Sequence, residues 1–175
     1  QLASGLSQDV ETDDNVFRQT TARLPWLLIG MLGGIGNSMI LGNFDSTFAA
    51  HPEMALYIPL IGGTGGNVGT QSSALVVQGL ANSSLNAENT FKQVLKESVV
   101  ALINATIISM LVYIYNFIRF GATATVSYSV SISLFAVVMF ASIFGTLVPM
   151  TLEKLKIDPA IATGPFISIT NDIIG

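Results

Sequence analysis

The run from Phe120 to Leu152, FGATATVSYSVSISLFAVVMFASIFGTLVPMTL, contains no Asp, Glu, Lys or Arg. A helix needs about 20 apolar residues to cross the roughly 30 Å hydrocarbon layer of a bilayer. The run is long enough to form such a helix. A buried helix in a soluble core is the alternative for one run taken alone, so the rest of the chain decides between the two.

Three further runs are equally free of charge. They lie between Arg23 and Asp45, between Glu53 and Glu88, and between Glu97 and Arg119. A soluble reading would require four wholly apolar long helices in a small domain. The chain of 175 residues is 50% hydrophobic and only 10% charged, whereas soluble domains carry about 25% charged residues. We therefore predict an all-α membrane protein.

A fifth apolar run begins after Asp158 and is too short to span as it stands. Either it is re-entrant or the given sequence stops inside a helix, and we favour the second reading. The prediction is a bundle of five transmembrane helices whose fifth helix is truncated. The absence of cysteine excludes a thiolate metal site, and no basic block indicates nucleic acid.

Basic residues predict the orientation of the bundle. Alternate connections carry very different numbers of Lys and Arg: one side has Arg18, Arg23, Lys92, Lys96, Lys154 and Lys156, and the other has Arg119. Because cytoplasmic loops are enriched in Lys and Arg, the N-terminus is expected in the cytoplasm. The loop from Asp45 to Glu53 is then expected outside.

The second span contains PLIGGTGGNVGTQSS at residues 59–73. Polar or broken helix is tolerated at membrane depth only where protein or a water-filled cavity covers it. Asn67 and Gln71 are four residues apart and share a helix face, which favours a hydrophilic lining. Close packing of small residues against another helix is the alternative.

Asp172 is a carboxylate in the otherwise uncharged fifth run, among the oxygen-bearing side chains of Ser168 and Asn171. Carboxylates at membrane depth cost free energy and usually mark ion or proton pathways. Oxygen ligands suit a hard cation such as Mg²⁺ or Ca²⁺. The Ser168 carbonyl and the Asp172 carboxylate lie on one face, since they are four positions apart. Asp172 could instead be solvated near a membrane end.

Asp158 directly precedes Pro159 at the start of the fifth run. An Asp before Pro is typical of a helix N-terminus, where the carboxylate caps free N–H groups. We interpret Asp158 first as a cap and second as a cation-attracting mouth.

Three stretches resemble the MgtE family of magnesium channels and their animal solute-carrier relatives. They are residues 59–73, residues 92–101 (KQVLKESVVA) and residues 158–175 (DPAIATGPFISITNDIIG). The resemblance implies a homodimer with one pore on the two-fold axis, lined by the second and fifth helices. It also implies that Asp172 matches the pore aspartate that holds hydrated Mg²⁺ and that Asn67 matches an asparagine near the pore. Gly164 departs from the family, because some members have Asn there at a second, cytoplasm-side ion contact.

Family members usually carry cytosolic regulatory domains and a long connecting helix ahead of the first span. The resemblance therefore implies that residues 1–23 are a cytosolic linker with the end of that helix, and that residues 24–175 are the transmembrane pore domain. The cytosolic regulatory domains are expected to be absent from this chain.

The resulting functional hypothesis is a passive Mg²⁺ channel in the cell membrane, without enzymatic chemistry. Its expected partners are a second copy of the chain, membrane lipid, and Mg²⁺ as the transported ion bound in the pore, with Co²⁺, Mn²⁺ and Ca²⁺ left open. A transporter coupled to Na⁺ or H⁺ is the first alternative, and a non-transporting membrane anchor is another. The predicted metal residues are Asp172, Ser168 and Asn67, and the predicted pore-lining residues are Gly164, Asn171, Gln71 and Asp158.

Overall fold

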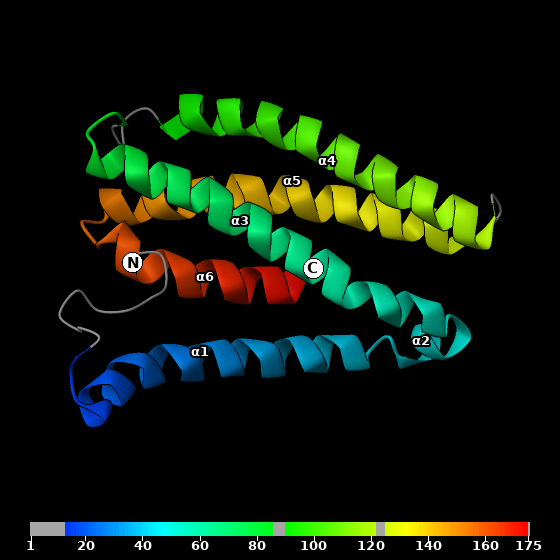
Figure 1. The fold of residues 1–175 in the computed structure, drawn as a ribbon, viewed down its shortest axis with the longest axis horizontal. Helices are drawn as coiled ribbons and strands as arrows, with labels where there is room; N and C mark the ends of the chain where they lie inside the picture. The colour runs from blue at the N-terminus through cyan, green and yellow to red at the C-terminus, as the bar shows by residue number, and fades with distance from the viewer. Residues whose placement is uncertain (1–12, 86–89, 122–124, 175) are drawn as a thin grey trace.

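The computed structural model describes residues 13–85, 90–121 and 125–174, and this part of the chain contains helices and no strand. Its long helices are α1 (Val16–Gly42), α3 (Ile58–Ala81), α4 (Thr90–Phe120), α5 (Thr125–Lys154) and α6 (Pro159–Ile174). Two short helices, α2 (Asp45–Ala50) and η2 (Pro52–Tyr57), connect α1 to α3. Figure 1 shows the long helices side by side along one axis.

Three of these helices, α1, α4 and α5, are long and apolar enough to cross a membrane. Helix α3 spans 24 residues, but its glycines and its amide and hydroxyl side chains make it less apolar. Helix α6 has 16 residues, fewer than the roughly 20 needed to cross the hydrocarbon layer. The all-helical class is confirmed, whereas the count of five transmembrane helices stays a prediction.

Helix α5 is the centre of the bundle and packs against α3, α4 and α6. Leu134, Val138 and Met150 of α5 are fully buried. On α4, Ala101, Ala105 and Ser109 are buried at four-residue spacing. Small side chains at this spacing let two helices approach closely in a membrane, where apolar burial alone does not hold helices together.

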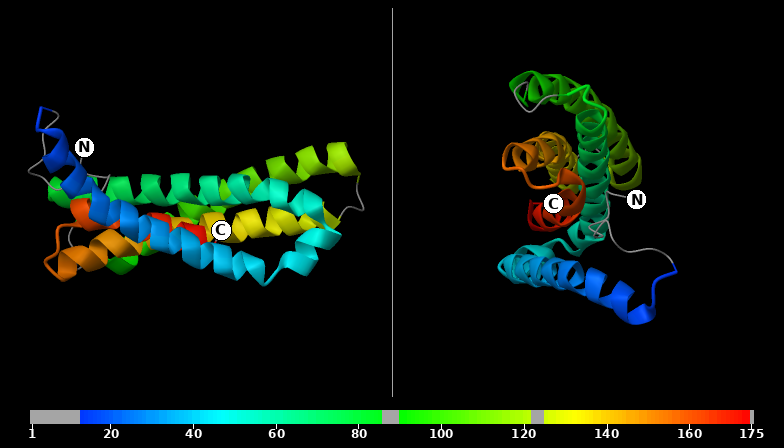
Figure 2. Two further views of the ribbon diagram at one scale, coloured as in Figure 1. Left: turned by 90° about the horizontal axis from the view of Figure 1, so that it is seen from below. Right: turned by 90° about the vertical axis from the view of Figure 1, so that its left-hand side faces the viewer.

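Helix α1 lies apart from this centre, as both figures of the ribbon show (Figures 1 and 2). None of its side chains is buried against the described residues, and it packs mainly along α6. The close point is Gly33, where an added Cβ would lie 2.9 Å from Cγ1 of Ile169. Glycine therefore allows the approach of α1 to α6.

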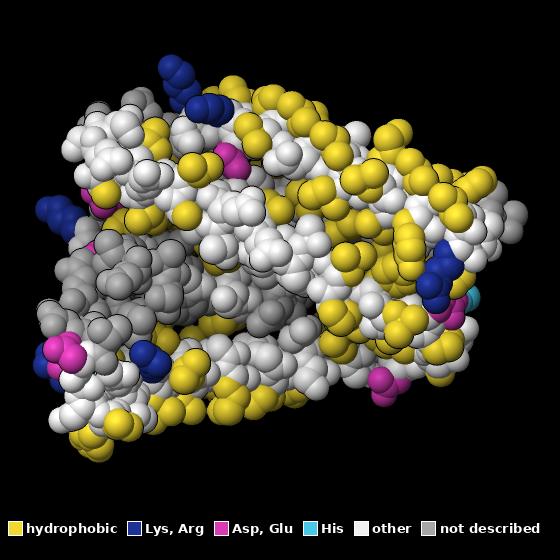
Figure 3. All heavy atoms as spheres, viewed as in Figure 1, with side chains coloured by type: hydrophobic (Ala, Val, Ile, Leu, Met, Phe, Trp, Pro, Cys, Tyr) yellow, Lys and Arg dark blue, Asp and Glu magenta, His cyan; other side chains and the backbone are white. Residues whose placement is uncertain are grey.

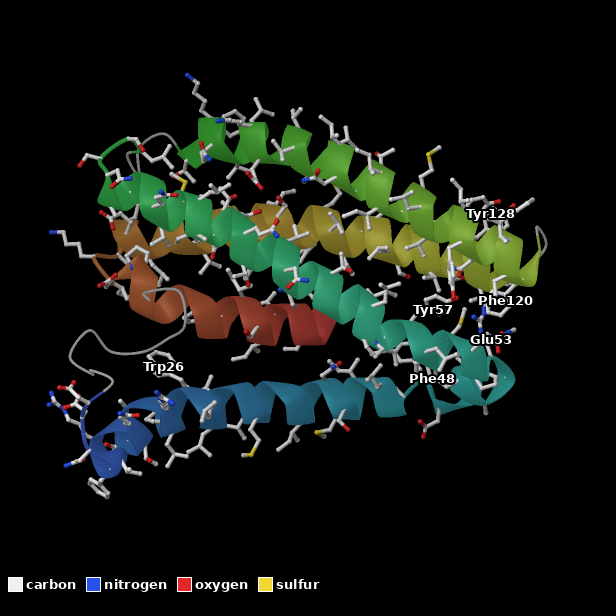
Figure 4. All side chains as sticks on the ribbon, viewed as in Figure 1. Trp26, Phe48, Glu53, Tyr57, Phe120 and Tyr128 are labelled. Carbon is white, nitrogen blue, oxygen red and sulfur yellow. The ribbon has the colours of Figure 1, made fainter. Side chains whose placement is uncertain are left out.

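Successive long helices run in opposite directions, so the connections alternate between two ends of the molecule (Figure 1). Lys and Arg side chains gather mainly at the end that holds the start of α1, the start of α4 and the α5–α6 connection (Figure 3). Tyr57, Phe120 and Tyr128 lie at the opposite end (Figure 4). There the Tyr57 hydroxyl donates a 2.5 Å hydrogen bond to Oδ1 of buried Asn116.

The start of α4 differs from the sequence interpretation. Lys92 and Lys96 were expected in a loop, but α4 begins at Thr90 and includes both. The exposed lysine side chains need no loop, because their long apolar stems can lie along a helix while the ammonium groups reach water. Because α4 begins at Thr90, Glu97 also lies within the helix, and its side chain is buried.

Candidate functional site between α3, α5 and α6

The glycine-rich stretch of α3 has two different faces. Gly65 and Gly69 are on the buried face. An added Cβ on Gly69 would lie 2.9 Å from Cγ2 of Ile167, and one on Gly145 of α5 would lie 2.5 Å from the Gly69 carbonyl oxygen. On this face the stretch packs closely against α5 and α6, which is the structural role of small residues in membrane helices.

The other face of α3 is polar and exposed on the single chain. It carries Asn67, Thr70 and Gln71. An added Cβ on Gly63 or Gly66 would meet no atom within 4 Å. The close-packing and polar-lining interpretations therefore apply to opposite faces of one helix.

On α6, Asn171 packs against the glycine face of α3. Its side chain is 4% exposed, and its Nδ2 atom has no hydrogen-bond partner among the described residues. The Asn171 Nδ2 atom lies 3.1 Å from the position that a Cβ on Gly69 would occupy. A buried amide donor without a hydrogen-bond partner costs free energy. The Asn171 side chain is therefore a polar group in the α3–α6 contact that can still donate a hydrogen bond.

The other predicted residues of this region are more exposed. Ser168 is exposed on α6, Gly164 is partly exposed, and Asp158 is exposed directly before Pro159. The backbone of Asp172 lies in α6, but its side chain is outside the described residues. No hydrogen bond joins Asn67 to Ser168, and the described part of the chain has no group of three His, Cys, Asp or Glu that could chelate a metal.

A buried polar cluster between α3, α4 and α5 was missed by the sequence analysis. The Ser72 hydroxyl donates to Oε1 of Glu97 at 2.6 Å, and the Ser142 hydroxyl donates to the same oxygen at 2.5 Å. The two serine oxygens are 3.0 Å apart. Glu97 is 9% exposed and is the one charged side chain among the buried residues that the structure describes. Each helix contributes one member, so the cluster ties the three helices together.

A cavity of about 560 Å³ adjoins this cluster. Its wall includes Glu97 and the polar side chains of Gln71, Gln93 and Asn104. The wall also includes residues of the α3–α4 connection, which places the cavity toward the end of the molecule that holds most basic side chains.

Comparison with known proteins places the chain in a family. Residues 58–175 match the model of the MgtE family, which is described as a divalent cation transporter. The chain belongs to the MgtE family. The resemblance found in the sequence motifs is thereby confirmed, and the family is one of transporters rather than enzymes.

Individual MgtE relatives match along most of the chain. It is 33% identical over 172 residues to the magnesium transporter MgtE of Bacillus subtilis, covering 98% of this chain and 38% of that protein. It is 33% identical to the Thermus thermophilus magnesium transporter MgtE, covering 88% of this chain and 34% of that protein. The corresponding values for Enterococcus faecalis are 29%, 93% and 36%. The chain thus spans about a third of the length of these relatives.

Membership of the MgtE family accounts for the apolar outer surface. Large hydrophobic side chains are exposed along α1 and α4, among them Leu27, Leu32, Ile107 and Met110. A soluble monomer rarely exposes contiguous apolar surface on this scale. In a membrane protein these side chains contact lipid, and the same surface then stabilises the inserted state.

Proposed function

We propose that this chain forms the ion-permeation part of a magnesium channel, through which Mg²⁺ passes down its own gradient. The observation that carries the proposal is the exposed polar face of α3 around Asn67. It lies on a helix whose neighbours α4 and α5 are long and apolar enough to span a membrane. Exposed polar groups at that depth need water or a protein partner. A pore on this face supplies both.

The second half of the proposed pore comes from α6, which packs beside α3. In a homodimer with its pore on the two-fold axis, each residue of the pore faces its own copy. Two Asp172 carboxylates and two Ser168 carbonyl groups would then surround the ion. Mg²⁺ loses its waters reluctantly, so these oxygens are proposed to bind the water shell of a hydrated ion.

The orientation and domain limits belong to the same proposal. The end that collects most Lys and Arg side chains (Figure 3) is placed in the cytoplasm. Residues 24–175 form the membrane unit, and residues 1–23 lead into it from the cytoplasmic side. The similarity to magnesium transporters from three bacteria supports Mg²⁺ as the transported ion.

The reversal potential of the current tests passive permeation directly. The protein is reconstituted into planar bilayers with a Mg²⁺ gradient, and Na⁺ and pH are then varied on one side. A passive channel gives a reversal potential that follows the Mg²⁺ gradient alone. A reversal potential that shifts in fixed proportion with the Na⁺ or H⁺ gradient would instead establish a coupled transporter, the second candidate.

A further inference from the structure

We propose that the cavity beside Glu97 holds a hydrated divalent cation, at a site separate from the proposed pore. This inference rests on the proposed function, because the proposed transport of Mg²⁺ is the reason to expect a divalent cation. The cavity is formed by α3, α4, α5 and the α3–α4 connection, and its described wall contains no residue of α6. A cation there is therefore held by α3, α4 and α5 and not by Asp172 or Ser168 of α6, and Gln71 is the one wall residue that also belongs to the predicted pore lining.

The hydrogen bonding of Glu97 is the first support. The hydroxyl groups of Ser72 and Ser142 both donate to Glu97 Oε1, at 2.6 and 2.5 Å. These bonds come from α3 and α5 and hold the buried carboxyl group at the wall of the cavity. Oxygen atoms of this kind are the ligands that hard cations prefer.

No basic side chain that the structure describes pairs with Glu97. Among the described residues, no Lys, Arg or His lies within ion-pair distance of it. Lys96 contributes to the same cavity wall, but its side chain is exposed and makes no ion pair with Glu97. A buried carboxylate without a partner is costly, and a cation in the adjoining cavity would offset that cost.

The cavity has the size and chemistry for a hydrated ion. Six waters occupy roughly 180 Å³ at about 30 Å³ each, which fits within the cavity of about 560 Å³. Gln71, Gln93 and Asn104 add amide oxygens that can accept hydrogen bonds from such waters. The described residues include no three-ligand acidic cluster, so the ion keeps its water shell and interacts through it.

The first test counts bound ions, with Mn²⁺ as a paramagnetic stand-in for Mg²⁺ because both prefer oxygen ligands. The electron paramagnetic resonance signal of free Mn²⁺ gives the number of ions bound per chain in detergent. We expect Glu97→Gln to lose one saturable Mn²⁺ per chain. The control Glu153→Gln, an exposed carboxylate at the end of α5, should bind as many ions as the parent. Unchanged binding by a folded Glu97→Gln protein would overturn the inference.

A second measurement applies even if Glu97→Gln does not fold. The chain contains no cysteine, so one nitroxide can be attached at Val100→Cys, an exposed apolar position on the cavity wall, and one at Thr47→Cys in α2 as the distant control. Mn²⁺ should broaden the spectrum at position 100 much more than at position 47. Equal broadening, or none, would contradict a cation in this cavity.

Asp172→Asn separates this inference from the proposed pore. In that background, broadening at position 100 should persist while Mg²⁺ flux falls. Loss of the broadening would place the ion at α6 and overturn the inference, with the pore proposal intact. Normal flux would overturn the pore site alone, and persistent broadening would still support the ion beside Glu97.

Discussion

At Gly145 the backbone of α5 comes into direct contact with the backbone of α3. An added Cβ would lie 2.5 Å from the carbonyl oxygen of Gly69 and 3.1 Å from Cβ of Ser72. Ser72 belongs to the Glu97 cluster, so the same crossing that packs the two helices also sets the position of a hydroxyl that contacts the buried carboxylate. Because Gly145 has no side chain, α5 can approach α3 closely enough to place Ser72 beside Glu97.

Gly145→Ala should therefore destabilise the protein. The obstructing atom belongs to the backbone, so relief requires moving a whole helix, and overpacking of this kind costs about 1–3 kcal/mol. Gly62→Ala is the matched control, because an added Cβ there meets nothing within 4 Å and alanine favours helix. Thermal unfolding in detergent should show a lower midpoint for Gly145→Ala and no decrease for Gly62→Ala. Equal midpoints would contradict the close crossing.

At the scale of the helices, the sequence predicted much of the arrangement. Long uncharged runs locate membrane helices reliably, because few other structures tolerate them. The boundaries were less predictable: Glu97 directly precedes an uncharged run, and nothing in that position indicates that Ser72 and Ser142 donate to it inside the bundle. Those serines are distant from Glu97 in the sequence, and the motif at residues 59–73 that contains Ser72 does not indicate its partner, so only the packing of α3, α4 and α5 reveals the cluster.

The two faces of α3 show the same limit. Glycine and amide residues are mixed along residues 59–73, and either close packing or a polar lining is compatible with that composition. The structure separates them, because Gly65 and Gly69 point to the interior while Asn67 stays exposed. Similarly, Asn171 lies against Gly65 and Gly69 because of the way α6 crosses α3. The periodicity of the sequence does not predict that crossing.

A second prediction concerns the hydrogen bond between Tyr57 at the end of η2 and Asn116 of α4. Tyr57→Phe removes the hydroxyl that donates to Asn116, whose side chain is fully buried and whose Nδ2 atom has no hydrogen-bond partner among the described residues. Leaving Oδ1 unpaired as well should cost about 1–3 kcal/mol. Tyr115→Phe, an exposed tyrosine on α4, is the control. The thermal midpoint should fall for Tyr57→Phe and stay near the parent value for Tyr115→Phe; a Tyr57→Phe midpoint at the parent value would show that the bond contributes little.

At the scale of the whole molecule, alternating helix directions collect most basic side chains at one end (Figure 3). The proposed orientation places this end in the cytoplasm. It also places the Glu97 cavity on the cytoplasmic side of the bundle, since that cavity includes Ser84 of the α3–α4 connection. Cations entering from the opposite end would then reach the cavity only after passing most of the membrane.

Cysteine labelling tests this orientation. A cysteine at exposed Ser84 should react with a membrane-impermeant maleimide from the cytoplasmic side alone, and a cysteine at exposed Thr47 from the outer side alone. Sidedness is measured in intact cells and in inside-out vesicles. The reversed pattern would invert the proposed topology without affecting the fold.

The central claim is that Mg²⁺ passes through a pore in which Asp172 of each chain faces the ion. The most direct measurement is Mg²⁺ uptake into proteoliposomes for the parent, for Asp172→Asn and for Asp45→Asn, an exposed carboxylate in α2 that undergoes the same change. The account predicts a loss of about tenfold or more for Asp172→Asn, as when an outer-shell partner of a metal ion is removed, and parent-like uptake for Asp45→Asn. Parent-like uptake by a folded Asp172→Asn protein would contradict it.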